Sequence, residues 1–94
     1  MTDEQIRCAL DEYQATLERL NASPEQFPHE RQGPQPAEGR NHAASMIPRM
    51  RAMVDDPAQR EKLMRWMGFL QGVLWLTSGY TMNQLRDHNR SPST

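Results

Sequence analysis

The most apolar and most periodic part of this chain is Asp56-Pro-Ala-Gln-Arg-Glu-Lys-Leu-Met-Arg-Trp-Met-Gly-Phe-Leu-Gln-Gly-Val-Leu-Trp-Leu76. We expect one long helix over residues 57–77, because Asp56 is a good N-cap, Pro57 suits the first helical position and Gln59 completes a capping box. Helical periodicity predicts a broad buried stripe on it. The stripe consists of Leu63, Trp66, Met67, Leu70, Val73 and Leu74, with Phe69 at its edge.

The opposite side of this helix carries Gly68 and Gly72, one turn apart. Each glycine in a helix interior costs roughly 1 kcal/mol relative to alanine, so something should compensate for that cost. One interpretation is the close approach of another helix, often between subunits. The other is a ligand or a second subunit lying against the bare backbone, with Trp75 beside it.

A first helix is predicted from about residue 3 to residue 21. Thr2 and Gln5 form a capping box, and a heptad seam follows them. The seam consists of Ile6, Leu10, Tyr13, Leu17 and Leu20. It fits one or two partner helices, in the same subunit or in a neighbour. Residues 24–40 contain four prolines and two glycines, with Phe27 as their only large apolar residue, which predicts a linker or an extended arm.

A second helix is expected from about residue 41 to residue 55. Its buried stripe is Ala43, Ile47, Met50 and Val54, widened by Met46 and Met53. Pro48 lies inside it, so we expect a kink around residues 44–48 or a helix that restarts at Pro48. Only Asp55-Asp56 joins this helix to the next one, which forces an antiparallel hairpin.

The chain ends in a short predicted helix, about 82–88, which a Thr81 and Gln84 capping box opens and whose inward residue is Leu85. Residues 89–94 are expected to be mobile. Together these elements predict one all-α domain over residues 1–94. A chain of 94 residues buries only a modest core, so self-association as a homo-oligomer is expected.

Composition excludes several classes of protein. The net charge of −1 hides an asymmetry: residues 1–38 carry three basic and eight acidic side chains, and residues 39–94 carry eight basic and four acidic. Neither half has a block of like charges suited to DNA, which favours a small acidic ligand instead. The single Cys8, the polar N-terminus and the absence of a long apolar run predict a cytoplasmic protein that does not enter membranes.

No residue pattern predicts catalysis or a metal site. The three histidines are scattered and have no recognised metal-ligand spacing with the cysteine. No phosphate-binding glycine loop, G-x-S-x-G motif or nucleophile beside a base is found. We therefore expect neither an enzyme nor a resident cofactor.

The candidate ligand-binding residues are cationic and aromatic. His42, Ser45 and Arg49 are spaced i, i+3, i+7 along the second helix, where their donors could grip a phosphate or a base edge. The N-terminus of that helix adds free N–H groups near Arg40 and His42 that favour an anion. The full predicted set is Arg40, His42, Arg49 and Arg65 for phosphate, with Trp75 and Tyr80 for base stacking.

The hairpin resembles a family of small phage proteins that sequester cyclic nucleotide signals, the anti-CBASS and Thoeris anti-defence sponges. The likeness covers about 40 residues, from His42 to near Tyr80. It is carried by Arg60-Glu-Lys62 at the start of the second hairpin helix, by Trp75, and by a methionine-rich, arginine-containing helix before them.

The chain departs from that family in its helix glycines, in its Met-Trp-Phe content, at Pro48 and in the segment 80–89. It is also similar to uncharacterised small phage and prophage proteins that share the segments 46–51 and 68–75. The sponge resemblance implies an all-helical homo-oligomer, often a hexamer, that binds cyclic oligonucleotides or molecules of the cyclic ADP-ribose type between protomers without cleaving them.

Two functions from different classes are consistent with these patterns. The first is a phage-type anti-defence protein that sequesters a cyclic nucleotide immune signal in the host cytoplasm. The second is a protein-interaction module that docks its apolar hairpin on a host protein to inhibit it. Sequence-specific DNA binding is a third hypothesis with less support than these two, because no helix presents a run of side chains suited to a DNA groove.

Overall fold

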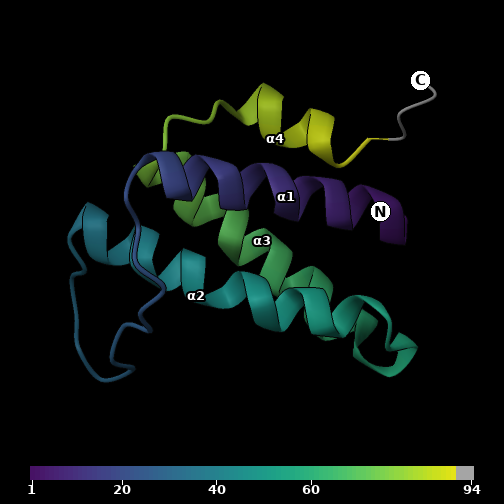
Figure 1. Ribbon diagram of the computed structural model, residues 1–94, viewed down its shortest axis with the longest axis horizontal. Helices are drawn as coiled ribbons and strands as arrows, with labels where there is room; N and C mark the ends of the chain where they lie inside the picture. The colour runs from purple at the N-terminus through teal and green to yellow at the C-terminus, as the bar shows by residue number, and fades with distance from the viewer. Residues whose placement is uncertain (91–94) are drawn as a thin grey trace.

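The computed structural model describes residues 1–90, in which four α-helices follow one another without a strand (Figure 1). They are α1 (Asp3–Arg19), α2 (Pro36–Val54), α3 (Arg60–Thr77) and α4 (Met82–His88), with a single 3₁₀ turn, η1 (Pro57–Gln59), before α3. The all-α class, the α2–α3 hairpin and the two flanking helices are as the sequence predicts.

Two of the predicted capping boxes are confirmed. The Thr2 hydroxyl accepts a hydrogen bond from the backbone N–H of Gln5 at 3.1 Å, and the Gln5 side chain accepts one from the Thr2 N–H at 2.7 Å. Thr81 and Gln84 make the same pair of bonds at 3.1 and 2.8 Å. Both boxes satisfy N–H groups that a helix start would otherwise leave without partners.

The second helix begins earlier than expected. Instead of starting near Asn41, α2 starts at Pro36, where the missing N–H of proline costs nothing. The N–H of Gln35 donates to the Glu38 carboxylate at 3.0 Å and holds the pKa of that carboxyl below its usual range. The proline content of residues 24–40 suggested a linker up to residue 40, but the last of these prolines opens the helix.

The interior proline does not divide α2. The helix runs without interruption from Pro36 to Val54, so it does not restart at Pro48. Pro48 is exposed to solvent. Since Pro48 has no N–H, the carbonyl of Ala44 lacks its usual partner within the helix.

The start of the third helix also differs from the prediction. Asp56 caps it as expected, accepting from the N–H of Ala58 at 3.0 Å, but residues 57–59 form the 3₁₀ turn η1 and α3 begins at Arg60. The Gln59 side chain donates to the Asp56 carboxylate at 3.0 Å. That bond takes the place of the bond to the Asp56 backbone that a capping box requires.

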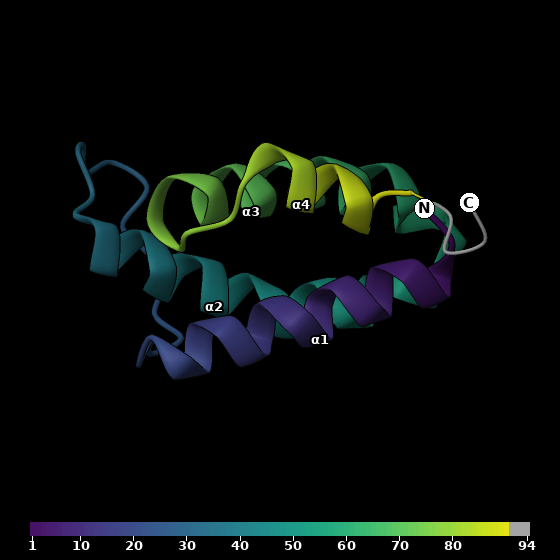
Figure 2. The same cartoon turned by 90° about the horizontal axis from the view of Figure 1, so that it is seen from above.

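One apolar core joins all four helices. Its buried members are Ile6, Ala9, Leu10, Tyr13, Leu17, Ala43, Met46, Ile47, Met50, Met53, Val54, Leu63, Met67, Leu70, Leu74 and Leu85. Seen from above, α1 and α2 lie on one side of the molecule and α3 and α4 on the other (Figure 2). The first helix, α1, therefore packs against the hairpin of its own chain. Its sequence had left open whether it packs in its own subunit or in a neighbour.

Most predicted core positions are confirmed, and four are not. Leu20 is 43% exposed because α1 ends at Arg19, one residue before it. Trp66 and Val73 are only partly buried at the edge of the core, and Phe69 is 56% exposed. The buried arc of α3 is therefore narrower than its sequence suggests.

The last residues that the structure describes contact the rest of the protein. Asn89, expected to begin a mobile tail, accepts a hydrogen bond from the Gln71 side chain at 2.9 Å. Residues 91–94 lie outside the described residues.

None of the helices described over residues 1–90 combines the length and the hydrophobicity that a membrane-spanning helix requires.

Candidate functional site

The main candidate site is a hollow of about 350 Å³ where α2 and α3 face each other. Its lining is Gln26, His29, His42, Ser45, Met46, Arg49, Arg65, Trp66 and Phe69. We call it the basic hollow. It brings together three of the predicted ligand-binding residues, His42, Arg49 and Arg65, and the Ser45 that was grouped with them.

A second hollow of about 400 Å³ continues from the first under the segment before α2. The two share His29, His42 and Phe69, and the second adds Phe27, Pro28, Arg31, Pro34, Gly39 and Val73. We call it the apolar hollow. The two together form a continuous surface that is cationic at one end and largely apolar at the other.

The helical period explains how these side chains meet. His42, Ser45 and Arg49 lie on one side of α2, and Arg65 and Phe69 lie one turn apart on α3. Because α2 and α3 are antiparallel neighbours, the two sets face each other across the hairpin. The rings of His42 and Phe69 meet edge to face, with centroids 5.9 Å apart.

The segment between α1 and α2, which includes most of the predicted linker or extended arm, is fastened to α2 and closes one side of both hollows. Three of its backbone N–H groups donate to α2: Ser23 to the Asn41 side chain at 2.9 Å, Glu25 to the Asn41 carbonyl at 3.2 Å, and Phe27 to His42 Nδ1 at 3.0 Å. These bonds fix the position of Phe27 and of the residues that follow it.

This contact selects one tautomer of the neutral His42 ring. Because Nδ1 accepts the Phe27 N–H, the neutral ring carries its proton on Nε2. Burial lowers the pKa of His42, and the positive charges of His29 and Arg49 lower it further. The neutral imidazole is therefore favoured, and its Nε2–H is left as a hydrogen-bond donor.

We expect the protein to lose stability as the pH falls through the range where His42 becomes protonated. The folded pKa lies below the value of about 6.5 in the unfolded chain, so the unfolded state binds the proton more readily. The stabilisation is complete above that value and is lost as the pH falls toward the folded pKa. Thermal unfolding of wild type and His42→Asn between neutral and mildly acidic pH measures this, since asparagine keeps an acceptor near Nδ1 without titrating.

His29→Asn is the control for the loss of a histidine: it removes only one of the two smaller, charge-based causes of the His42 shift and leaves the larger one, burial, in place. Within residues 1–90 the exposed His29 ring bonds only the neighbouring Gln26 side chain, at 2.8 Å. The acid-side fall in melting temperature should be smaller in His42→Asn than in wild type and in the control. An equal fall in all three proteins would contradict this assignment of the His42 protonation state.

The charge of the basic hollow is uncompensated. Its lining contains two arginines and two histidines and no carboxylate. Arg49 makes no ion pair within residues 1–90, and Arg65 makes only a solvent-exposed one with Glu61 at 3.4 Å. Exposed pairs of this kind contribute little, so both guanidinium groups remain free to bind an anion.

No protein-family model, no curated protein and no solved structure matches this chain. The chemistry of the hollow is therefore inferred from its own residues.

The other three predicted site residues lie elsewhere. Arg40 donates to the carbonyl of Thr77 at 2.9 Å and fastens the end of α3. Since α2 begins at Pro36, Arg40 and His42 follow its first turn, and the free N–H groups expected beside them are not there. Trp75 is 46% exposed and lines neither hollow. The Tyr80 hydroxyl bonds that of Thr16 at 2.7 Å.

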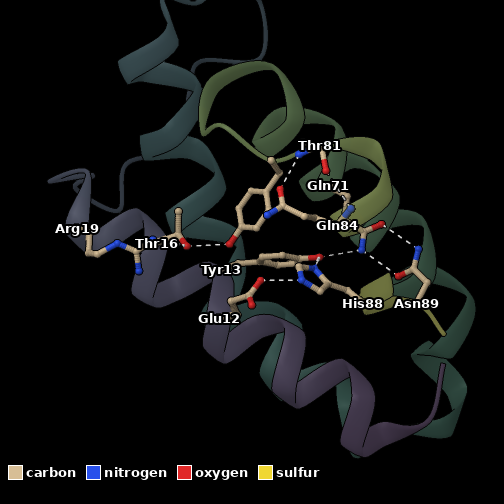
Figure 3. A network of polar contacts seen from close by, with 10 residues as sticks. Glu12, Tyr13, Thr16, Arg19, Gln71, Thr81, Gln84, His88 and Asn89 are labelled. Atoms are coloured by element: carbon tan, nitrogen blue, oxygen red, sulfur yellow. Dashed lines mark hydrogen bonds and ion pairs between the residues drawn. The ribbon is translucent and has the colours of Figure 1, made fainter. Parts of the chain in front are cut away.

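A polar network that the sequence did not predict surrounds Tyr13 (Figure 3). The fully buried Tyr13 hydroxyl lies 2.7 Å from His88 Nδ1 and accepts from the Gln71 side chain at 3.0 Å. His88 Nε2 lies 2.8 Å from the Glu12 carboxylate. Since Gln71 donates to Tyr13, the phenol proton points to His88 Nδ1, and His88 donates through Nε2 to Glu12.

This chain of carboxylate, imidazole and hydroxyl fastens α4 to the core and presents no nucleophile. Burial raises the pKa of Tyr13 to about 12, so the phenol stays protonated at neutral pH. Its side chain has no surface that a substrate could reach. No local pattern could reveal the network, because its partners are 58 and 75 positions apart from Tyr13. Across residues 1–90, no cluster of His, Cys, Asp and Glu side chains forms a candidate metal site.

Proposed function

We propose that the protein captures a small phosphate-bearing nucleotide, of the cyclic class that phage sponges sequester, and holds it without cleaving it. The observation that carries the proposal is the basic hollow, where Arg49 and Arg65 lie beside the aromatic rings of Trp66 and Phe69 and no carboxylate belongs to the lining. A nucleotide requires both features, a cationic group for phosphate and a flat apolar group for the base.

The phosphate end of the ligand is assigned to α2 and α3 together. Guanidinium forks bind phosphate oxygens in pairs, and one arginine comes from each helix. The Nε2–H of His42 is a neutral donor beside them. Ser45 donates its hydroxyl proton to the His42 carbonyl at 2.6 Å, so its oxygen keeps its lone pairs for a ligand donor, such as an amino group of a base.

The base is assigned to Phe69. Its ring is 56% exposed and lines both hollows, so it stands between the cationic end and the apolar end. It takes the stacking role that the sequence had given to Trp75 and Tyr80. Trp66, whose ring lies 5.3 Å from the Lys62 ammonium group, forms the other side. Volumes of about 350 and 400 Å³ suit a small ligand.

Binding without cleavage is supported by the chemistry of the lining. The basic hollow contains no carboxylate, cysteine or lysine. The Ser45 proton is directed to a backbone carbonyl, and His42 presents a donor instead of a basic lone pair. Neither side chain is arranged as a nucleophile with its base.

Isothermal titration calorimetry tests the proposal with cyclic dinucleotides, cyclic trinucleotides and cyclic ADP-ribose isomers. We expect at least one of them to bind with micromolar or tighter affinity and to be recovered unchanged by mass spectrometry. Inorganic phosphate and uncharged nucleosides are the controls and should bind far more weakly. Absence of heat with every nucleotide at micromolar protein would overturn the proposal, and a host-protein complex insensitive to nucleotide would favour the docking alternative.

A further inference from the structure

The outward side of α3 is apolar where a solvated helix should be polar. Over its last three turns the exposed positions are Gly68, Phe69, Gly72, Trp75 and Leu76, none of them charged. We call these five residues the outer face. Phe69 is 56% exposed, Trp75 46% and Leu76 76%. An apolar stripe of this kind on a helix normally packs against another surface.

The two glycines of the outer face have no function inside the single chain. A Cβ atom added to Gly68 or Gly72 would meet no atom within 4 Å. The predicted approach of another helix to this backbone is therefore not made by any of the described residues. Glycine in a helix interior is unfavourable, and alanine would fit at both positions without a clash.

We propose that a second copy of this chain covers the outer face, with the two α3 helices crossing antiparallel on a two-fold axis at Gly72. A two-fold interface must be self-complementary, because the same surface serves both partners. The outer face meets this condition, since it contains both a bare groove and large side chains. Its glycines allow the two backbones to approach closely at the crossing.

Residue spacing fixes which side chains meet in this arrangement. Gly68 and Leu76 lie four positions on either side of Gly72, so each Leu76 faces the bare backbone of the partner's Gly68. Phe69 and Trp75 lie three positions on either side, so each Phe69 faces the partner's Trp75. Large side chains are thus opposed to grooves, and aromatic rings to aromatic rings, the pairing that close packing favours.

Charge supports the antiparallel direction. Arg65 lies seven positions before Gly72, so it faces the region seven positions after Gly72 in the partner, next to the end of α3. The antiparallel direction therefore keeps the two Arg65 side chains at opposite ends of the crossing, where they do not repel each other. A parallel crossing would instead set the two Arg65 side chains beside each other.

The available area is that of a weak dimer whose formation depends on concentration. At about 200 Å² for each large side chain, Phe69, Trp75 and Leu76 together expose about 350 Å² of apolar surface. A stable interface uses about 800 Å² from each partner. The glycine backbone and the stem of Arg65 enlarge the contact but do not double it, so the association should depend strongly on protein concentration.

The dimer links the outer face to the candidate site. Phe69 belongs to both, because its ring lines the basic hollow and the apolar hollow. The partner's Trp75 would lie against Phe69 at the rim of the site and form one wall of it. Trp75, which lines neither hollow of its own chain, would thus line the basic hollow of the partner chain. The dimer itself does not depend on the proposed nucleotide.

Sedimentation velocity of the full chain without nucleotide tests the proposal at micromolar and higher concentrations. Wild type should form dimers. Gly72→Ala should raise the melting temperature of the dilute monomer, because alanine favours the helix, and should weaken the dimer about 10-fold. Gly72→Leu should be monomeric at all these concentrations. Ala52→Leu, which places the same leucine side chain at an exposed position on α2, is the matched control and should leave the dimer unchanged.

Cross-linking tests the position of the axis independently of stability. In a Cys8→Ser background, Gly72→Cys should form a disulfide-linked dimer under mild oxidation, whereas Ala52→Cys should not. Monomeric wild type at high concentration would overturn the proposal. So would a dimer that tolerates Gly72→Leu, or one that Gly72→Cys fails to link. None of these outcomes depends on whether a nucleotide binds, so the proposed function is tested separately.

Discussion

Replacing Arg49 and Arg65 together by glutamate is expected to lower nucleotide affinity about 100-fold or more. Each guanidinium group is assigned hydrogen bonds to phosphate oxygens, and charge-assisted bonds contribute about 1.5–3 kcal/mol each. The reversal also places two carboxylates in a lining that has none. Calorimetric titration with the nucleotide that binds wild type best gives the measured ratio.

The control for that experiment must carry the same change in charge. Arg86 and Arg90 are both exposed and lie outside the basic hollow, so the pair Arg86→Glu and Arg90→Glu changes net charge equally. Affinity should stay within a few-fold of wild type in this control. If both double variants lose affinity to the same extent, the overall charge of the protein explains binding, and the basic hollow is not the site.

Tyr13→Ala should produce the largest loss of stability among single substitutions, about 3–5 kcal/mol. The side chain is fully buried in the core and packs against the rings of Tyr80 and His88, with centroids 5.5 and 5.3 Å away. Its removal leaves a cavity and also releases the hydrogen bonds that hold α4. Denaturant unfolding followed by circular dichroism measures the loss.

Tyr13→Phe separates the hydrogen bonds from the packing. It keeps the ring but leaves the Gln71 amide and His88 Nδ1 without the hydroxyl, which should cost about 1–3 kcal/mol. Tyr80→Phe, which loses a single bond to Thr16 at a half-buried site, is the control and should cost less. A Tyr13→Phe variant as stable as wild type would show that the network does not hold α4.

The raised pKa of Tyr13 gives the same network a signature in alkaline solution. The folded pKa of about 12 exceeds the value of 10.0 for an unperturbed tyrosine, so the folded state keeps its proton longer. The stabilisation is complete below pH 10 and is lost as the pH rises toward 12. Tyr13→Phe should reduce this alkaline loss in the same unfolding experiments. It leaves the part that comes from Tyr80, whose pKa is also raised by burial.

Most of the fold was predictable because its signals are local. The Thr2 and Thr81 caps act within three residues, and the buried stripe of α2 follows from the helical period alone. The two-residue join before Pro57 leaves no geometry other than an antiparallel hairpin. The start of α2 was missed because Pro36 is compatible both with a linker and with the first turn of a helix.

The candidate site was predictable only in part. Residues that share one helix could be grouped from the sequence, whereas residues that meet across two helices could not. His42 and Arg49 lie at helical spacing on one element, so sequence alone placed them together. Whether Arg65, Trp75 or Phe69 faces them depends on how α3 is rotated about its axis, and this rotation is set by packing against α1 and α2 together. Phe69 was therefore assigned to the edge of the core, and Trp75 to a site that its own chain does not form.

Local stretches of sequence specify the helices, most of their caps, the hairpin and the cationic character of the second half, because each depends on neighbours within one or two turns. The packing of whole helices determines which polar groups meet, as Tyr13, Gln71 and His88 do across three helices. It also decided that the glycines of α3 face outward, where no described residue covers them. These features depend on the rotation and crossing of whole helices, which the shared core selects and no short stretch of sequence encodes.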